Sequence, residues 1–163
     1  MPAFIEKLVV AEALKGERVV RLKGGDPLLF DRGGEEVEHL RALGTRVEVV
    51  NGITSGLAAV TPLGVPLRDR DMRTVFLTGH AHGESNSLHW PMLAACAAQG
   101  ITLVICIGVA TIEALQASLL KGLAAHTPVT VVQNFSLPQQ RHVVSTLAAW
   151  LKRCDASKSA ARR

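Results

Sequence analysis

The sequence alternates between two hydrophobic periodicities along most of its length, and this alternation constrains the fold more than any other feature. Short apolar runs typical of buried strands are separated by longer segments whose apolar residues recur at helical spacing. The predicted strands are residues 18–22, 46–50, 74–78, 101–107 and 128–133, and the predicted helices are residues 3–15, 35–43, 53–60, about 88–99, 111–120 and a last one ending near 153. Such alternation favours a largely parallel sheet covered on both faces by helices, so the predicted fold class is α/β.

Composition excludes several other classes of protein. The chain has 163 residues, of which 48% are hydrophobic and 20% charged, which is typical of a globular protein with a core. No apolar run approaches the roughly 18 residues that cross a bilayer, so we expect a cytoplasmic protein without a membrane segment. The cysteines Cys96, Cys106 and Cys154 are odd in number and form no CxxC pair, which favours reduced thiols.

The charge balance gives little support for nucleic-acid binding. The formal net charge is +4, and much of it lies in the last residues, "LKRCDASKSAARR". We interpret residues 155–163 as a basic tail. The chain has four Phe, two Trp and no Tyr, so no aromatic series is available for stacking on bases, and no nucleic-acid partner is expected.

Polar and glycine-rich segments follow the predicted strands, where parallel sheets bind their ligands. These segments are Lys23–Pro27, Gly52–Ser55, Gly79–His82, Gly108 and Asn134–Arg141. The first of them carries the clearest pattern. Gly24 and Gly25 permit positive φ and close approach of a ligand to the backbone, while Pro27 pushes Asp26 toward an extended conformation. Asp26 would then either contact a ligand or simply cap a tight turn between a strand and a helix.

Four longer stretches carry a resemblance to a known family. They are "VVRLKGGDPLLFDRGGEE", "VEVVNGITSGLAAVTPLGVPL", "FLTGH" and "PVTVVQNFSLPQQRHVVSTL". Together they resemble the uroporphyrinogen-III C-methyltransferases of the tetrapyrrole methylase family, from about Phe4 to Arg153. The resemblance implies a tetrapyrrole methylase-like fold in which two α/β domains hold S-adenosyl-L-methionine between them. It also implies methylation of uroporphyrinogen III to precorrin-2, a step toward sirohaem and cobalamin.

The same resemblance implies a set of cofactor-binding residues. Carried over by position, they are Gly24, Gly25, Asp26, Leu29, Thr54, Ser55, Ile107 and Phe135. Two of them depart from the family pattern, because Ile107 stands where Met is usual and Phe135 where Gly or Ala is usual. The family's "THRD" is replaced by "RDRD" at residues 68–71, which puts a substrate contact there in doubt.

The resemblance also predicts the domain organisation. The family's first strand, its "GAGPGDP" loop and the Asp and Lys with acid and base roles would all precede residue 1, so no catalytic residue is assigned within this chain. Residues 1–50 would form the rear part of the first domain and residues 51–154 a nearly complete second domain. The expected partners are a tetrapyrrole substrate and either a second copy of the chain or the missing N-terminal half. A non-catalytic remnant or interaction module of the same family is the alternative.

Two further groups of residues are candidates for binding a ligand. His80, His82, Glu84 and His89 lack a recognised metal-ligand spacing, so no metal is predicted. Basic residues near the predicted ligand edge could attract the carboxylates of a tetrapyrrole, or they could simply form a solvated edge. They are Arg21, Lys23, Arg32, Arg68, Arg70 and Arg141.

Overall fold

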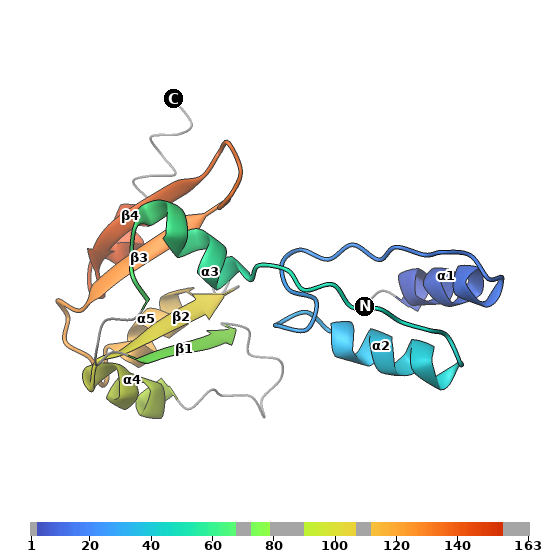
Figure 1. The fold of residues 1–163 in the computed structure, drawn as a ribbon. Helices are drawn as coiled ribbons and strands as arrows, with labels where there is room; N and C mark the ends of the chain where they lie inside the picture. Colours follow the sequence, from blue (N-terminus) through green and yellow to red (C-terminus); the bar gives the residue numbers. More distant parts are fainter. Residues whose placement is uncertain (1–2, 68–72, 79–89, 107–111, 155–163) are drawn as a thin grey trace. The chain divides into compact units, whose positions relative to one another are not determined.

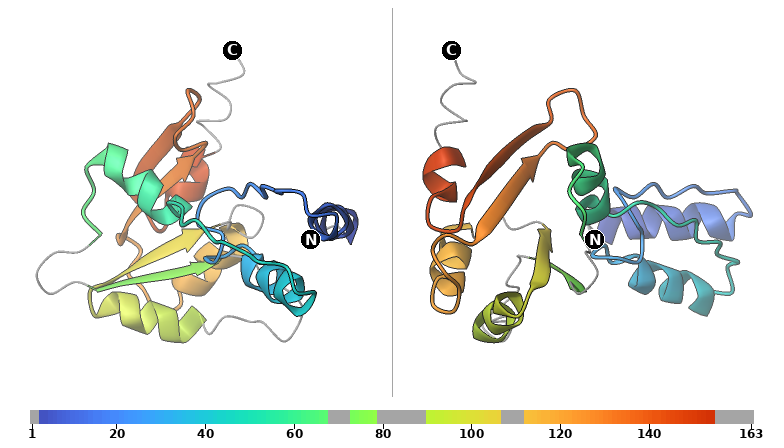
Figure 2. Two further views of the ribbon diagram at one scale, coloured as in Figure 1. Left: turned by 45° about the vertical axis from the view of Figure 1, so that its right-hand side comes forward. Right: turned by 60° about the vertical axis from the view of Figure 1, so that its left-hand side comes forward.

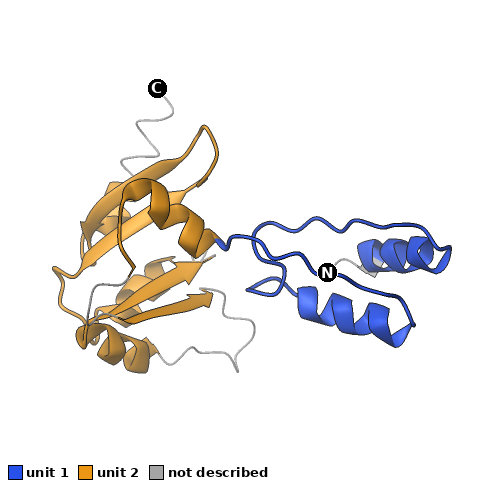
Figure 3. Ribbon diagram, viewed as in Figure 1, with its two compact units in different colours: residues 1–54 blue, residues 55–163 orange. Residues whose placement is uncertain are grey.

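The structure, a computed structural model, describes residues 3–67, 73–78, 90–106 and 112–154. The chain divides into two compact units, residues 1–54 and 55–163 (Figure 3). The division falls between Thr54 and Ser55, four residues beyond the domain boundary predicted from the sequence. In the described parts of the chain, no helix is long and apolar enough to cross a membrane.

Unit 1 contains two helices that lie side by side (Figure 1). Helix α1 spans Ala3–Leu14 and helix α2 spans Gly33–Ala42, close to the bounds predicted for both. Helix α2 carries two glutamates in its first turn and His39 and Arg41 in its last, charges that complement the helix dipole. Gly16 and Gly44 follow the two helices with positive φ, the conformation that glycine commonly adopts at a C-terminal cap.

The two strands predicted in unit 1 are not formed. Residues 18–22 and 46–50 have no regular secondary structure, and Val20, Leu22 and Val50 are 75%, 79% and 74% exposed. The apolar pattern is correct for a strand, but a strand also needs a neighbour to pair with its backbone, and no local pattern supplies one. Within the described residues of unit 1, no strand pairing occurs.

In the described parts of unit 2 the strands form two small sheets rather than the single, largely parallel sheet that was predicted (Figures 1 and 2). Strand β1, Arg73–Thr78, pairs in parallel with β2, Ile101–Cys106, and helix α4, Trp90–Ala98, lies between them in the chain. Strand β3, Pro128–Gln133, pairs antiparallel with β4, Arg141–Thr146. Strand β4 was not predicted. The segment after β3 is polar, and the apolar residues that follow it also fit the spacing of the predicted last helix.

The hydrophobic core belongs to unit 2. Helix α5, Ile112–Leu119, contributes Leu115 and Leu119 to a buried cluster with Ala94, Leu147 and Trp150. Residues 150–154 are helical, in line with the predicted last helix. Among the described residues, every buried hydrophobic side chain lies in unit 2. Unit 1 therefore depends on close backbone contacts and charged groups for its order.

Candidate functional site

The glycine loop after residue 23 makes a close backbone contact with the segment before α3 (Ser55–Val60). A Cβ on Gly52 would lie 2.1 Å from the carbonyl oxygen of Gly25 and 3.3 Å from the amide nitrogen of Asp26. Gly25 has a φ of +103°, and a Cβ there would lie 3.4 Å from the carbonyl oxygen of Ile53. A side chain at position 52 would push the two backbones apart, and the positive φ at position 25 favours glycine there.

Both carboxylate oxygens of Asp26 accept hydrogen bonds at this contact. Oδ1 accepts a hydrogen bond of 2.9 Å from the Leu28 N–H, and Oδ2 accepts one of 3.3 Å from the Gly52 N–H. The prediction that Asp26 caps a turn is therefore confirmed. Each oxygen still has a second lone pair, so the carboxylate can also accept a hydrogen bond from a ligand. Leu29, the next predicted contact, is 39% exposed.

Thr54 and Ser55 follow directly and lie on either side of the division between the units. Thr54 is a buried polar residue, 6% exposed, and its Cα borders Gly25. Ser55 begins α3 and its Oγ donates a hydrogen bond of 3.3 Å to Sγ of Cys106. Cys106 is the last residue of β2 and pairs with Thr78 at the end of β1. Ser55 thus lies at the carboxyl edge of the parallel strands, where the α/β rule predicts ligand contacts.

Gly56 holds α3 against the same two strands. A Cβ on Gly56 would lie 2.6 Å from Cγ1 of Val104 and 2.7 Å from Cε1 of Phe76. The side chains of β1 and β2 therefore touch the helix backbone itself. This close packing fixes the start of α3, and with it the position of the Ser55 hydroxyl at the strand ends.

The remaining predicted cofactor residues are less well defined by the fold. Phe135 is half-buried in the turn between β3 and β4 and is not part of the buried cluster. Its neighbours Asn134 and Ser136 both have positive φ, +53° and +60°. Ile107 lies outside the described residues, as do the "RDRD" segment and the histidine-rich loop. Among the residues that are described, no group of His, Cys, Asp and Glu could hold a metal ion.

Two of the basic side chains of unit 1, Arg21 and Lys23, contact carboxylates of the same unit. The side chain of Lys23 is 8% exposed, and its Nζ lies 3.1 Å from Oδ1 of Asp31 and 2.7 Å from Oε1 of Glu36. Arg21 lies 3.5 Å from Glu36 through its Nε. These pairs link positions 8 to 15 residues apart, so no local spacing could have predicted them. The charge of Lys23, at least, is used inside the fold rather than offered to an anionic ligand.

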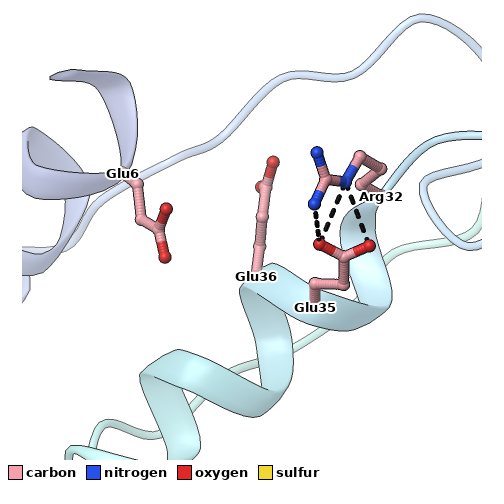
Figure 4. A pocket seen from close by; sticks show the side chains of 4 residues that line it. All are labelled: Glu6, Arg32, Glu35 and Glu36. Carbon is pink, nitrogen blue, oxygen red and sulfur yellow. Dashed lines mark hydrogen bonds and ion pairs between the residues drawn. The ribbon is translucent and has the colours of Figure 1, made fainter. Parts of the chain in front are cut away.

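Arg32 and Glu35 form an exposed pair at the start of α2, beside a small hollow lined by Glu6, Arg32, Glu35 and Glu36 (Figure 4). Arg32 Nε donates to both carboxylate oxygens of Glu35, at 3.0 and 2.9 Å. The hydrogen bond raises the pKa of Arg32 and lowers the pKa of Glu35, and the Coulomb attraction adds to both shifts. The spacing of three residues is a signal of this pair that the sequence analysis did not use.

Comparison with known proteins places these features in a family. The sequence model of the Tetrapyrrole (Corrin/Porphyrin) Methylases matches residues 2–150. The uroporphyrinogen-III C-methyltransferase of Pseudomonas aeruginosa is 43% identical over 151 residues, which cover 91% of this chain and 60% of that protein. The siroheme synthase of Azotobacter vinelandii is 44% identical over 147 residues, covering 88% of this chain and 31% of that protein.

Solved structures agree with the sequence comparison. The uroporphyrin-III C-methyltransferase of Thermus thermophilus, crystallised with S-adenosylhomocysteine, superposes with a TM-score of 0.75 at 32% identity, covering 93% of this chain and 66% of that one. A cobalt precorrin-4 methyltransferase, at 22% identity and a TM-score of 0.80, shows the same fold. The chain spans about three fifths of the length of the curated C-methyltransferases that it matches.

Proposed function

Because the chain belongs to the tetrapyrrole methylase family, we propose that it takes part in the S-adenosylmethionine-dependent C-methylation of uroporphyrinogen III to precorrin-2. The product would enter sirohaem or cobalamin synthesis, and we place the reaction in the cytoplasm. Among the reactions of the family, C-methylation of uroporphyrinogen III is supported by the uroporphyrinogen-III C-methyltransferase of Pseudomonas aeruginosa, which is 43% identical to this chain. The relative from Thermus thermophilus, crystallised with S-adenosylhomocysteine, supports the choice of methyl donor.

One observation carries the proposal, namely the contact between the glycine loop and the segment that leads into α3. It places the bare backbone of Gly25 against Gly52 and Ile53, and Ser55 follows at the carboxyl edge of β1 and β2. A Cβ added to Gly24 would meet nothing within 4 Å, so the peptide groups beside it are open to a ligand. S-adenosylmethionine has amino, carboxylate and ribose hydroxyl groups that peptide groups and hydroxyls can bind.

The proposed contacts to the methyl donor follow from this arrangement and from the family. They are Gly24, Gly25, Asp26, Leu29, Thr54, Ser55, Ile107 and Phe135. When bound, the donor supplies the methyl group as an activated sulfonium. The residues of this chain would hold and orient it.

The alternative, a module that binds partners without turnover, also has an observation in its favour. Unit 1 exposes many large hydrophobic residues, among them Phe4 at 74%, Leu22 at 79% and Ile53 at 69%. Apolar surface of this kind is typical of an interface. A second copy of the chain or a separate polypeptide of the family could cover it.

A complementation assay tests the proposal and separates it from the alternative. The purified chain is incubated without oxygen with S-adenosylmethionine and uroporphyrinogen III, alone and with the part of the Pseudomonas aeruginosa relative that it does not match. We expect precorrin-2 to form in the mixture and not with either polypeptide alone. A mixture that assembles and binds S-adenosylhomocysteine but forms no product would contradict the proposed reaction and support the non-catalytic module.

A further inference from the structure

The side chain of Lys23 is more buried than those of its charged neighbours Arg21, Asp31 and Glu36, and Lys23 is not among the proposed cofactor contacts. Its side chain is 8% exposed, although it directly precedes Gly24 and Gly25 in a segment where Val20 and Leu22 are largely exposed. Lysine is rarely buried to this degree unless its charge is paired. The local fold therefore gives this one side chain a specific environment.

Lys23 joins the two ends of the glycine loop. Its Nζ contacts Asp31, which lies on the returning side of the loop, at 3.1 Å, and Glu36 in the first turns of α2 at 2.7 Å. Glu36 is itself 13% exposed in its side chain. Figure 4 shows Glu36 beside the Arg32–Glu35 pair on α2. The loop from Gly24 to Phe30 is thus closed at its base by a buried ammonium group held between two carboxylates.

The loop needs such a closure because its backbone is strained. Phe30 has a φ of +61°, a left-handed conformation that is unfavourable for a residue with a side chain. Gly33 lies so close to Pro27 that a Cβ there would meet the Pro27 carbonyl oxygen at 2.1 Å. Among the described residues of unit 1, no hydrophobic side chain is buried that could hold this shape by packing. The ion pairs of Lys23 connect the two sides of the loop directly.

We infer that Lys23 is a positioning residue for the cofactor site: it does not touch the methyl donor, but it fixes the loop that presents Gly24, Gly25 and Asp26. This inference rests on the proposed function for its consequence in binding. The ordering of the loop by Lys23 follows from these contacts and does not depend on the proposed function. Removal of the ammonium group leaves Glu36 with Arg21 at 3.5 Å but takes away the contact that joins Asp31 to Glu36, so the base of the loop opens.

The test compares Lys23→Met, which keeps the length and apolar stem without the charge, with Lys15→Met. Lys15 makes a similar contact, 2.7 Å to Glu12, but its side chain is 64% exposed. Two readouts are taken: the order parameters of the Gly25, Leu28 and Gly52 amides from nitrogen-15 relaxation, and the affinity for S-adenosylhomocysteine by calorimetry. In Lys23→Met the order parameters should fall from about 0.85 to below about 0.6, and the affinity should fall at least about tenfold. Lys15→Met should change neither.

Two further variants keep the outcome decisive. Asp31→Asn leaves the contact with Glu36 and should lower the affinity by less than Lys23→Met does, while Lys23→Arg restores a charge and donors and should recover most of the loop order. Loop amides that stay as ordered in Lys23→Met as in wild type would overturn the inference. A wild-type chain that fails to bind S-adenosylhomocysteine would refute the proposed function instead, and the relaxation data would still decide the role of Lys23. If Lys23→Met fails to fold, Asp31→Asn decides the question. A loss of order limited to the loop amides of Asp31→Asn supports the inference, whereas loop amides as ordered as in wild type overturn it.

Discussion

Gly52→Ala is the smallest change that should separate the glycine loop from the segment before α3. The added Cβ would lie 2.1 Å from the carbonyl oxygen of Gly25, whereas ordinary contacts of this kind are longer than about 3 Å. The two backbones must therefore move apart by roughly 1 Å. The Gly52 N–H bond to Asp26 is already 3.3 Å long, so a movement of that size breaks it.

The expected cost can be worked out from these contacts. Overpacking costs about 1–3 kcal/mol, and the loss of a hydrogen bond to a charged group costs about 1.5–3 kcal/mol. The two effects describe one displacement, so they are not added, and we expect a loss of about 2 kcal/mol in the stability of unit 1. At about 1.4 kcal/mol for each factor of ten, this corresponds to a roughly 30-fold change in the opening equilibrium.

The assay must observe unit 1 separately, because the two tryptophans, Trp90 and Trp150, both belong to unit 2. Hydrogen exchange of the α2 amides should become roughly 30-fold faster in Gly52→Ala, while urea unfolding followed by tryptophan fluorescence should not change. Gly34→Ala is the comparison variant: a Cβ there meets nothing within 4 Å, and because alanine favours the helix more than glycine does, exchange of the α2 amides should be unchanged or slower rather than faster. Wild-type exchange rates in Gly52→Ala would refute the close contact of the two segments.

Three more predictions concern single side chains. Gly25→Val should weaken S-adenosylhomocysteine binding at least about tenfold in calorimetry, because valine adopts a φ of +103° only with strain and the loop backbone would shift; equal affinities would remove this loop from the site. Phe135→Gly should strengthen the same binding if the ring intrudes on the cofactor, and since the ring lies outside the buried cluster, the unfolding free energy should fall by less than the roughly 3 kcal/mol of a core residue; a larger loss in thermal melts would place the ring in the core. Glu35 should titrate below the ordinary glutamate range in carboxyl NMR spectra and return toward it in Arg32→Gln. Because the folded pKa is lowered, the small stabilisation is present above the unfolded pKa and is lost as pH falls through the folded pKa; an unchanged titration in the variant would contradict the pairing.

The sequence predicted the local features of the fold well, for physical reasons that particular residues illustrate. The sequence predicted that Gly25 permits positive φ, and its φ is +103°. The close contact of Gly52 with the carbonyl oxygen of Gly25 was not predicted. Strands β1 and β3 and the helices α1, α2, α4 and α5 follow from hydrophobic periodicity and from glycine stops, both of which act over a few residues.

The features that the sequence did not predict depend on distant partners. Residues 18–22 and 46–50 have strand-like patterns, yet they form no strand, because pairing is decided by a neighbour elsewhere in the chain. The split into two sheets and the pairing of β4 with β3 have the same cause. The contacts of Lys23 with Asp31 and Glu36 depend on how the loop folds back, and spacings of 8 and 13 residues carry no signal of that. The cofactor residues came from the family resemblance, and their role in binding stays a prediction.

The most direct test of the cofactor site is a titration of the nitrogen-15-labelled chain with S-adenosylhomocysteine, followed through its backbone amide resonances. We predict saturable shifts of the amide resonances of Gly24, Gly25, Asp26, Thr54 and Ser55. We expect these shifts to be absent in Gly25→Val. Saturable shifts that leave these amides unchanged, or no saturable shift in a chain that is folded, would contradict the claim that the glycine loop and the start of α3 hold the methyl donor.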